Sequence, residues 1–587
     1  MNYREHEACL PSRFLLPPGQ PVADLSLRSW LLAAIFFAAG VWLYTRHNGF
    51  PCYYHPEEPG KARQLLTERF NFHHPLLLLQ ATWLTSWITR PPQMPQPVVE
   101  TGRTVSAIFA AGAVACFSLL AAHLYGSAAA ACVGALLLAN SQLYELAHYM
   151  KEDAAFAFGI AAFFLALTRC WLRPSMTRLA VLGAAAALAV SAKYIGALVV
   201  PFALVPAFQL REKGCHRVLI LSAALFAVLL VINFPIFASL DSFLGGLGRE
   251  VDFVLHGHKG LTRSVPHDFY VGVFLGARNP VIWILLGLYY VRLFTFSRRI
   301  HPAEWMLTLF PILYVLILSF SPKAANHYFL PDTLIFCVLA AFGLFCFTLG
   351  GSARITFGVQ VAGFLAAFGI SVAHLIPYDF AFNVDSRQQL LAFVRQNVPP
   401  TATIAQDKSV NLPNRSDPRH ASAPYFLEQT IVGHFFAADV GSIDELRARG
   451  IRYIAVAEKD YGWFFRRTHR PTKSILADYN RRKNFYERLF REGELLWECK
   501  AGLLPILQPH IRLYYLPSEP PSGKAQGGGL EQQDVARKRI CGRDWPHSDS
   551  LVKIMEICCS KDVVGARRDE LGRWSCWVFC TQSSRVS

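Results

Sequence analysis

The chain is short of charged residues. Lysine, arginine, aspartate and glutamate make up only 17% of its 587 residues, whereas a soluble chain typically has about 25%. The deficit lies between Leu27 and Pro377, where short clusters of charge separate long apolar runs, and from Asp385 to Pro517 the composition is again that of a soluble domain. This pattern excludes a wholly soluble protein and predicts a membrane domain followed by a water-exposed domain.

Other common features are missing as well. The sequence shows no internal repeat, and its fourteen cysteines show no recurring spacing typical of a metal site. We therefore expect most cysteines to act as small core hydrophobes, above all those within apolar runs: Cys116, Cys132, Cys337 and Cys346. The first apolar run, Trp30 to Tyr44, has no small-residue cleavage site close behind it, so we expect an uncleaved first span.

Acidic residues are outnumbered, and the formal net charge is +16. Nucleic-acid binding is one interpretation of a basic protein. Much of the basic charge, however, lies in short connectors between apolar runs, a placement that suits anionic lipid headgroups and topology control. We therefore expect a lipid bilayer as a partner and no nucleic acid.

The apolar runs are long enough to cross about 30 Å of hydrocarbon. The sequence predicts an all-α polytopic membrane domain at 29–376 with about eleven transmembrane helices. We place them near 29–46, 103–122, 127–147, 153–171, 177–192, 195–210, 217–235, 271–294, 304–320, 331–349 and 355–376.

Lysine and arginine in the short connectors predict the orientation. Alternate connectors are basic: Arg173 with Arg178, Arg211 with Lys213 and Arg217, Arg292 with Arg298 and Arg299, and Arg354. These should be cytoplasmic, together with the N-terminal segment 1–28. The opposite connectors then lie outside, at about 47–102, 148–152, 191–195, 236–270 and 321–330, with everything after 377.

The region 377–517 is expected to form a small extracytoplasmic α/β domain, because helical and strand patterns alternate there. The expected elements are a helix at 388–396, a strand at 402–405, a helix at 443–449 and a buried strand at 450–456. Residues 518–587 begin with a Gly-rich flexible linker, and we assign the tail after it no role.

The first outside loop holds the most unusual chemistry. Glu57 and Glu58 are adjacent, Lys61 follows them, and His73 and His74 come a little later. Two neighbouring carboxylates tend to raise the pKa of one of them, which suits a general base. A solvated loop with turns at its prolines is the alternative, but the clustering of acids, cations and histidines favours a site for a phosphate-bearing lipid.

The other outside segments carry further candidates, each with a simpler explanation. Asp153, in Lys151-Glu152-Asp153, suits the first turn of a helix, and Lys193 could extend to the membrane interface. The long loop 236–270 contains His256 and could bind a metal or form a mobile cover. Lys323 and His327 could hold a phosphate, whereas Tyr328 could be an interfacial aromatic residue.

Taken in order, these segments resemble the GT-C superfamily of glycosyltransferases, in the branch of the protein O-mannosyltransferases and lipid A aminoarabinose transferases. The resemblance covers 29–517 and rests on Glu57-Glu58 with Lys61-Ala62 and His74-Pro75, Gly102-Arg103, Lys151-Glu152-Asp153 with Ser191-Ala192-Lys193-Tyr194, and Ser321-Pro322-Lys323 through Tyr328-Phe329-Leu330-Pro331. The usual acidic pair of the family begins with aspartate, so the choice between Glu57 and Glu58 is left open.

The resemblance implies an inverting transfer of a hexose or pentose from a polyprenyl-phosphate donor to a protein, lipid or glycan acceptor, at the extracytoplasmic face of a bacterial inner membrane. Glu57 or Glu58, with Asp153, would deprotonate or position the acceptor. The cations that would neutralise the donor phosphate are Lys61, Arg103, Lys151, Lys193 and Lys323. The residues that would contact substrate are His74, His256, His327 and Tyr328, and His74 and His256 would bind a divalent metal if one is used.

Two other classes compete with a transferase. A transporter or flippase of lipid-linked sugars favours polar sites near the bilayer midplane and often has inverted repeats, whereas here the ionisable residues lie at the outer ends of spans. A non-catalytic scaffold that presents the 377–517 domain would not need the charged loop clusters.

Overall fold

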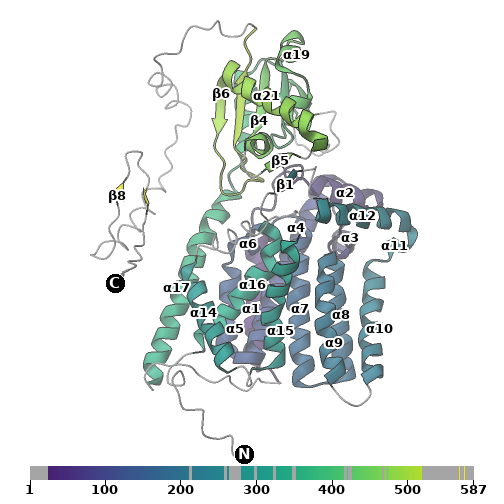
Figure 1. Cartoon of the computed structure of the whole chain (residues 1–587), viewed down its shortest axis with the longest axis vertical. Coiled ribbons are helices and arrows are strands. Elements are labelled where there is room, and N and C mark those ends of the chain that lie inside the picture. The colour runs from purple at the N-terminus through teal and green to yellow at the C-terminus, as the bar shows by residue number, and fades with distance from the viewer. Residues whose placement is uncertain are drawn as a thin grey trace, which may run out of the picture. The chain divides into compact units, whose positions relative to one another are not determined.

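The computed structural model in Figure 1 describes residues 24–209, 214–256, 261–263, 279–296, 300–320, 326–346, 352–414, 420, 426–465, 469–471 and 473–518, and the short segments 567–568 and 574–575. The chain divides into two compact units, Met1–Pro520 and Pro521–Ser587. In the second unit, the described residues form one short antiparallel pair, β8 (Arg567–Arg568) with β9 (Trp574–Ser575).

Seven helices among the described residues are long and apolar enough to cross a membrane. They are α1 (Leu27–Thr45), α4 (Pro95–Tyr125), α7 (Glu152–Leu172), α10 (Gly214–Ile232), α15 (Pro302–Ser319), α16 (Leu330–Leu344) together with the preceding turn as His327–Leu344, and α17 (Ala353–Ala381) as the first part of Ala353–Asn397. An eighth span arises if α5 (Ser127–Leu138) and α6 (Ser141–Ala147), which meet at a 61° bend, are counted together. Three shorter apolar helices accompany them: α8 (Met176–Ala192), η1 (Tyr194–Val199) continuing into α9 (Val200–Gln209), and α14 (Pro280–Thr295). The expected number of eleven spans is not reached by length, and it stays a prediction.

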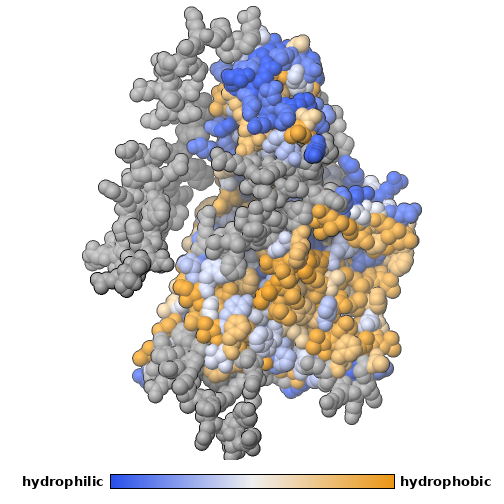
Figure 2. Space-filling model, viewed as in Figure 1, coloured by the Kyte–Doolittle hydropathy of each residue, from blue (hydrophilic) through white to orange (hydrophobic). Residues whose placement is uncertain are grey.

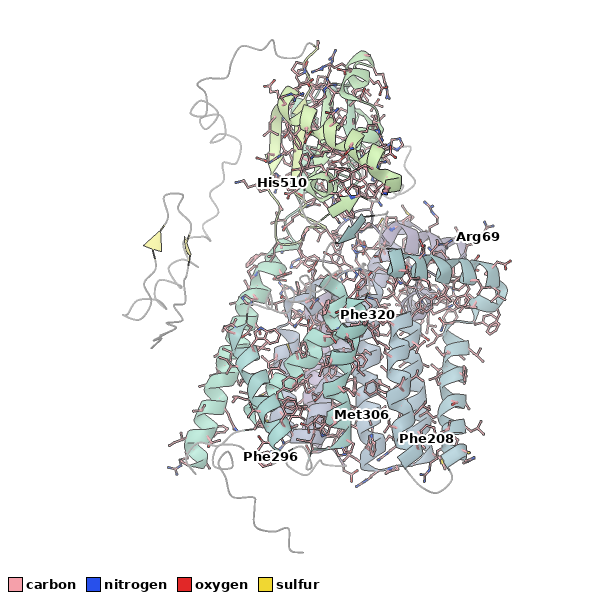
Figure 3. The ribbon with its side chains drawn as sticks, viewed as in Figure 1. Arg69, Phe208, Phe296, Met306, Phe320 and His510 are labelled. Carbon is pink, nitrogen blue, oxygen red and sulfur yellow. The ribbon has the colours of Figure 1, made fainter. Side chains whose placement is uncertain are left out.

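Small residues allow the central helices to approach closely. A Cβ atom added at Gly159 of α7 would lie 2.6 Å from the Cα of Ala189 in α8. Glycine is therefore required at this crossing, as is common where membrane helices pack through small residues. Hydrophobic residues dominate the surface of the helical bundle and hydrophilic ones that of the α/β region (Figure 2). In Figure 3, Phe208 and Phe296 lie at one end of the bundle and Phe320 and Arg69 near the other.

One predicted cytoplasmic cation is in fact buried. Arg292 lies in the last turn of α14 with only 1% of its surface exposed. It donates to the hydroxyl of Tyr125 and pairs with Glu304 at 3.4 Å, and Tyr125 donates to Glu304 at 2.6 Å. Arg292 therefore joins α14, α4 and α15 and is not a solvated connector residue. Arg211, Lys213, Arg298 and Arg299 lie outside the described residues, so the orientation stays a prediction.

A mixed five-stranded sheet follows the bundle, in the order β3-β2-β4-β7-β6. Its strands are β2 (Thr403–Gln406), β3 (Thr430–Gly433), β4 (Tyr453–Ala457), β6 (Glu494–Cys499) and β7 (Ile511–Tyr515). β2 pairs in parallel with β3 and β4, and β7 pairs antiparallel with β4 and β6. The predicted strands at 402–405 and 450–456 correspond to β2 and β4.

Helices cover both faces of this sheet because successive residues of β4 point to opposite sides. Ala455 packs with Leu390 and Val394 of α18 (Ser386–Asn397). On the other face, Ile454 packs with residues of α19 (Ile443–Ala448) and α21 (Leu476–Glu492). The helices predicted at 388–396 and 443–449 are thus confirmed as α18 and α19, and the small α/β fold is present.

The remaining elements are short. They are α2 (Glu58–Thr67), α3 (Leu77–Thr89), α11 (Pro235–Ala238), α12 (Leu240–His256), β1 (Leu261–Arg263), η3 (Asn326–Phe329), η5 (Ala437–Asp439), α20 (Glu458–Tyr461), η6 (Gly462–Phe464), β5 (His469–Pro471) and η7 (Lys473–Ile475). β1 pairs antiparallel with β5.

The segment 236–270, expected as a long loop, contains the helix α12. Leu240, Leu244, Val251 and Leu255 leave an exposed apolar stripe along it, a pattern typical of a helix that lies in the membrane interface. Its other side meets the first loop closely, since a Cβ atom at Gly246 would lie 2.5 Å from the carbonyl oxygen of Asn71.

Candidate active site

The two adjacent glutamates of the first loop have different surroundings. Glu57 precedes α2 at its N-cap position, and its side chain is 37% exposed. Lys61, one turn later, lies 3.1 Å from Glu57 Oε2, and Lys151 lies 3.7 Å from Glu57 Oε1. Of the two glutamates, Glu57 is the one that an external molecule can reach.

Glu58 is fully buried against Arg103 of α4. The guanidinium donates twice to its carboxylate, from Nε at 2.9 Å and from Nη2 at 2.6 Å. The Met150 amide donates to Glu58 Oε1 at 3.0 Å, and Arg103 Nη1 donates to the carbonyls of Asn48 and Phe50, each at 2.5 Å. Both side chains, predicted as a catalytic residue and a phosphate ligand, are thus engaged with each other and with the backbone.

A second pair of carboxylates opens α7, where the positive end of the helix dipole favours negative charge. Glu152 and Asp153 are both buried. Lys61 Nζ lies 2.8 Å from Glu152 Oε2, so Lys61 bridges Glu57 and Glu152. Glu152 was not singled out from the sequence as a site residue, although its place beside Asp153 was the available signal.

Asp153 is held by two lysines. Lys193 follows α8 and donates to Asp153 Oδ1 at 2.5 Å. Lys151 lies 3.5 Å from Asp153 Oδ2, an oxygen that is buried without a hydrogen bond among the described residues. Lys151 therefore links Asp153 to Glu57.

These groups form one assembly, the lysine–carboxylate cluster, which consists of Glu57, Glu152, Asp153, Lys61, Lys151 and Lys193. Three carboxylates face three ammonium groups, so the formal charges balance. Balance matters because an unpaired buried charge is strongly destabilising.

The cluster keeps its loop members ionised. Burial alone would raise the pKa of Glu57, but the ammonium groups of Lys151 and Lys61 outweigh it and hold that pKa well below its ordinary value. Burial would lower the pKa of Lys61, but Glu152 and Glu57 raise it above its ordinary value. At neutral pH, Glu57 is therefore a carboxylate and Lys61 an ammonium.

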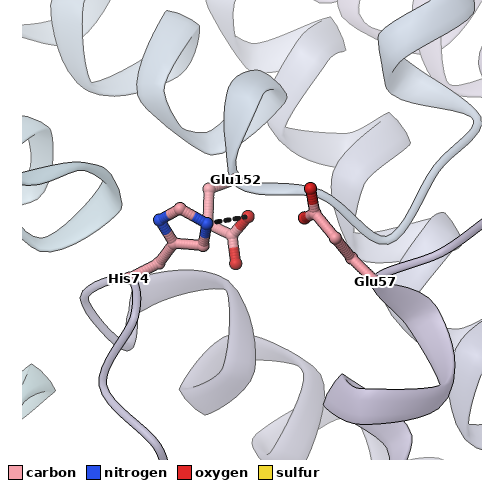
Figure 4. Close-up of side chains that lie close together, drawn as sticks. All are labelled: Glu57, His74 and Glu152. Carbon is pink, nitrogen blue, oxygen red and sulfur yellow. Dashed lines mark ion pairs between the residues drawn. The ribbon is translucent and has the colours of Figure 1, made fainter. Parts of the chain in front are cut away.

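His74 stands at the edge of the cluster, just before α3. Its Nε2 lies 4.0 Å from Glu152 Oε2 (Figure 4). Ligand atoms of Glu57, His74 and Glu152 lie within 4.8 Å of one another, and imidazole and carboxylate groups are suitable ligands for zinc. The Lys61 ammonium, however, already lies between the two carboxylates, so the donor set does not fit a dication while Lys61 is in place.

Removing that ammonium should create a metal site. We expect Lys61→Met to bind Zn²⁺ at least about tenfold more tightly than the unaltered chain, because a unit charge at ~4 Å costs roughly 4 kcal/mol at an effective dielectric constant near 20. Zinc titration calorimetry of the two purified chains measures the difference. Tight zinc binding by the unaltered chain would contradict this account.

Of the remaining predicted residues, two lie near the cluster and two have side chains that the structure does not describe. The side chain of His327 is within electrostatic range of Lys151, Asp153 and Lys193. Lys193 Nζ lies 5.2 Å from the centre of the Tyr328 ring. Lys323 lies outside the described residues, as does the side chain of His256, whose backbone ends α12.

The α/β domain also holds the first loop, which the sequence did not indicate. The Asn411 side chain donates to the Tyr53 carbonyl at 2.6 Å, and Gln388 donates to the Tyr54 hydroxyl at 3.2 Å. The Arg387 guanidinium lies over the Tyr54 ring at 4.5 Å. The α/β domain therefore holds the part of the first loop that comes just before Glu57.

No protein-family model and no curated protein matches the sequence. The structure is similar to the crystal structure of ArnT from Cupriavidus metallidurans in the apo state, with 14% identity over 82% of this chain and 97% of that chain and a TM-score of 0.46. The same protein bound to undecaprenyl phosphate gives 14% identity over 83% and 98% and a TM-score of 0.45. The archaeal oligosaccharyltransferase AglB from Archaeoglobus fulgidus, in complex with an inhibitory peptide and a dolichol-phosphate, gives 10% identity over 81% and 80% and a TM-score of 0.45.

Proposed function

We propose that this chain is a GT-C-type membrane glycosyltransferase that moves a sugar from a polyprenyl-phosphate donor to an acceptor at the extracytoplasmic face, with inversion at the anomeric carbon. The observation that carries the proposal is the half-exposed carboxylate of Glu57, held between Lys61 and Lys151 at the start of a cluster that three connectors build. Such an arrangement offers a base, and cations for a phosphate leaving group, at one place.

Glu57 is the group that meets the acceptor. The acceptor hydroxyl oxygen attacks the anomeric carbon, the bond from that carbon to the phosphate oxygen breaks, and the hydroxyl proton passes to Glu57. Asp153 serves as the second carboxylate, since its Oδ2 makes no hydrogen bond among the described residues. Glu58 and Arg103 hold the loop in place and do not contact substrate.

The lysines serve the donor. Lys61, Lys151 and Lys193 would stabilise the negative charge that develops on the departing polyprenyl phosphate. In the resting cluster these three ammonium groups already pair with the carboxylates. A bound phosphate would therefore compete with the carboxylates for the same ammonium groups. Donor binding would then raise the pKa of Glu57 and make it a stronger base at the moment when the acceptor must lose its proton.

The proposal predicts turnover of a lipid-linked sugar. We expect the full chain in nanodiscs to release polyprenyl phosphate from a radiolabelled polyprenyl-phosphate sugar, by transfer to an acceptor or to water, as thin-layer chromatography measures. Movement of intact donor across a proteoliposome membrane, without release of polyprenyl phosphate, would favour a flippase instead.

A further inference from the structure

A separate pocket lies on the water side of the first loop. It has a volume of about 320 Å³, including space open to solvent. The first loop contributes Tyr53, Tyr54, Pro56 and Pro59, and the α/β domain contributes Arg387, Lys408, Ser409, Asn411 and Lys459. None of these side chains belongs to the lysine–carboxylate cluster.

Three cations line this pocket, and the nearby acids are occupied. Asp460 accepts from the amide and the hydroxyl of Ser409, at 2.7 and 3.0 Å. Glu458 lies 2.8 Å from the His510 ring. Asp385 caps α18 by accepting from two backbone amides. Asp460 therefore offsets only part of the positive charge of the three cations.

Arg387 and Lys459 differ in their burial and in the contacts that hold their charged groups. Arg387 is buried, and its guanidinium is fixed by the carbonyls of Ser409, at 3.0 Å, and Ile506, at 2.6 Å. Lys459 is exposed, and its ammonium has no ion-pair partner in the part of the chain that the structure describes. Desolvation by the surrounding protein lowers the pKa of Lys459 to about 8, and the positive charges of Arg387 and Lys408 add a repulsion that Asp460 only partly offsets. An incoming anion would relieve this repulsion.

A fixed guanidinium beside two ammonium groups is well suited to a phosphate or carboxylate, through charge-assisted hydrogen bonds. We propose that this pocket binds an anionic group, phosphate or carboxylate, carried by the acceptor. The assignment to the acceptor rests on the proposed function, because Pro56 lines the pocket and Glu57 is the next residue, about 3.8 Å away along the chain. An anion held here places the rest of the acceptor beside the base.

Inorganic phosphate is the probe for the site. We expect the full chain in nanodiscs to broaden the ³¹P resonance of phosphate saturably. In Lys459→Gln/Lys408→Gln the affinity should fall at least tenfold, with an unchanged melting temperature. The matched control is Lys483→Gln, on the exposed side of α21, where Lys483 pairs with Glu487 at 3.6 Å. Phosphate binding that is absent, or equal in the double variant and the control, overturns the proposal.

Two further arms separate the possible sources and outcomes. The affinity for phosphate is compared between nanodiscs of phosphatidylglycerol and nanodiscs of phosphatidylcholine. Weaker phosphate binding in phosphatidylglycerol alone, through competition by its headgroup, identifies a lipid-borne acceptor anion. Equal phosphate binding in both lipids identifies a soluble acceptor anion. The affinity lost in Lys459→Gln/Lys408→Gln should be lost equally in a Glu57→Gln background, because the pocket is separate from the ammonium groups that Glu57 contacts. Phosphate binding without any turnover of donor would support the anion site and contradict the transferase function. Turnover without phosphate binding would contradict the anion site alone.

Discussion

Replacing Glu57 with glutamine is expected to lower the rate of sugar transfer by ~10²–10⁴, the usual contribution of a positioned general base. The amide keeps the size of the side chain but cannot accept the proton. The change also leaves Lys61 and Lys151 with one carboxylate fewer, so the melting temperature should fall, but only modestly because Glu57 is 37% exposed. Single-turnover transfer of radiolabelled sugar, beside a thermal melt, measures both effects.

The pH dependence gives a second test of Glu57. Its pKa lies well below the ordinary value because Lys151 and Lys61 outweigh the effect of burial. The carboxylate, which is the active form, is therefore lost only when the pH falls through that lowered pKa. We expect kcat/KM for the donor, which reports the donor-free enzyme, to stay flat down to pH values below the ordinary range of glutamate. Full transfer by Glu57→Gln, or a fall in kcat/KM as the pH drops just below neutral, would show that Glu57 is not the base.

Replacing Glu58 with glutamine is expected to act on stability instead. The change leaves the fully buried guanidinium of Arg103 without its countercharge, and breaking a buried pair from one side costs ~3–5 kcal/mol. We expect a clear fall in the melting temperature of the detergent-solubilised chain. The protein that remains folded should still transfer sugar, because Glu58 does not face the cluster.

A second variant separates stability from chemistry at this position. Glu58→Leu/Arg103→Met removes both charges, and replacing a buried pair by apolar residues is often close to neutral. We expect it to recover part of the stability lost in Glu58→Gln, because the Met150 amide and the carbonyls of Asn48 and Phe50 still lose their partners. If Glu58→Gln kept its stability and lost transfer, Glu58 and not Glu57 would be the base.

The sequence was sufficient to collect most of the cluster but not to sort its members. Glu57 and Glu58 are neighbours with the same side chain, and what separates them is Arg103, which lies 45 residues later and pairs with Glu58. Likewise Lys151-Glu152-Asp153 was recognised as a segment, yet which carboxylate faces Lys61 depends on the helical rotation at the start of α7. Such differences arise from tertiary packing, which no local spacing encodes.

The fold shows the same limit. Apolar runs located the bundle, and α8 (Met176–Ala192) matches the run expected at 177–192, whereas α9 (Val200–Gln209) begins later than the run expected at 195–210. Arg292 was counted as a connector residue because no local pattern indicates its pairing with Glu304, 12 residues later. In the α/β domain, periodicity predicted β2, β4, α18 and α19. The hydrogen bond from Asn411 to the Tyr53 carbonyl joins residues 358 positions apart. The contact of the α/β domain with the first loop could therefore not be predicted from local sequence patterns.

The close approach of α12 to the first loop connects the candidate site to a helix that has the exposed apolar stripe of a membrane-interface helix. Gly246 lets the helix rest on the backbone at Asn71, and Glu250 lies 3.3 Å from His73, the residue before His74. If α12 lies in the interface as its apolar stripe predicts, we expect a change in bilayer thickness to shift this helix and, through Glu250, His73. Under the proposed function, turnover should then depend on lipid composition even where no headgroup reaches the carboxylates.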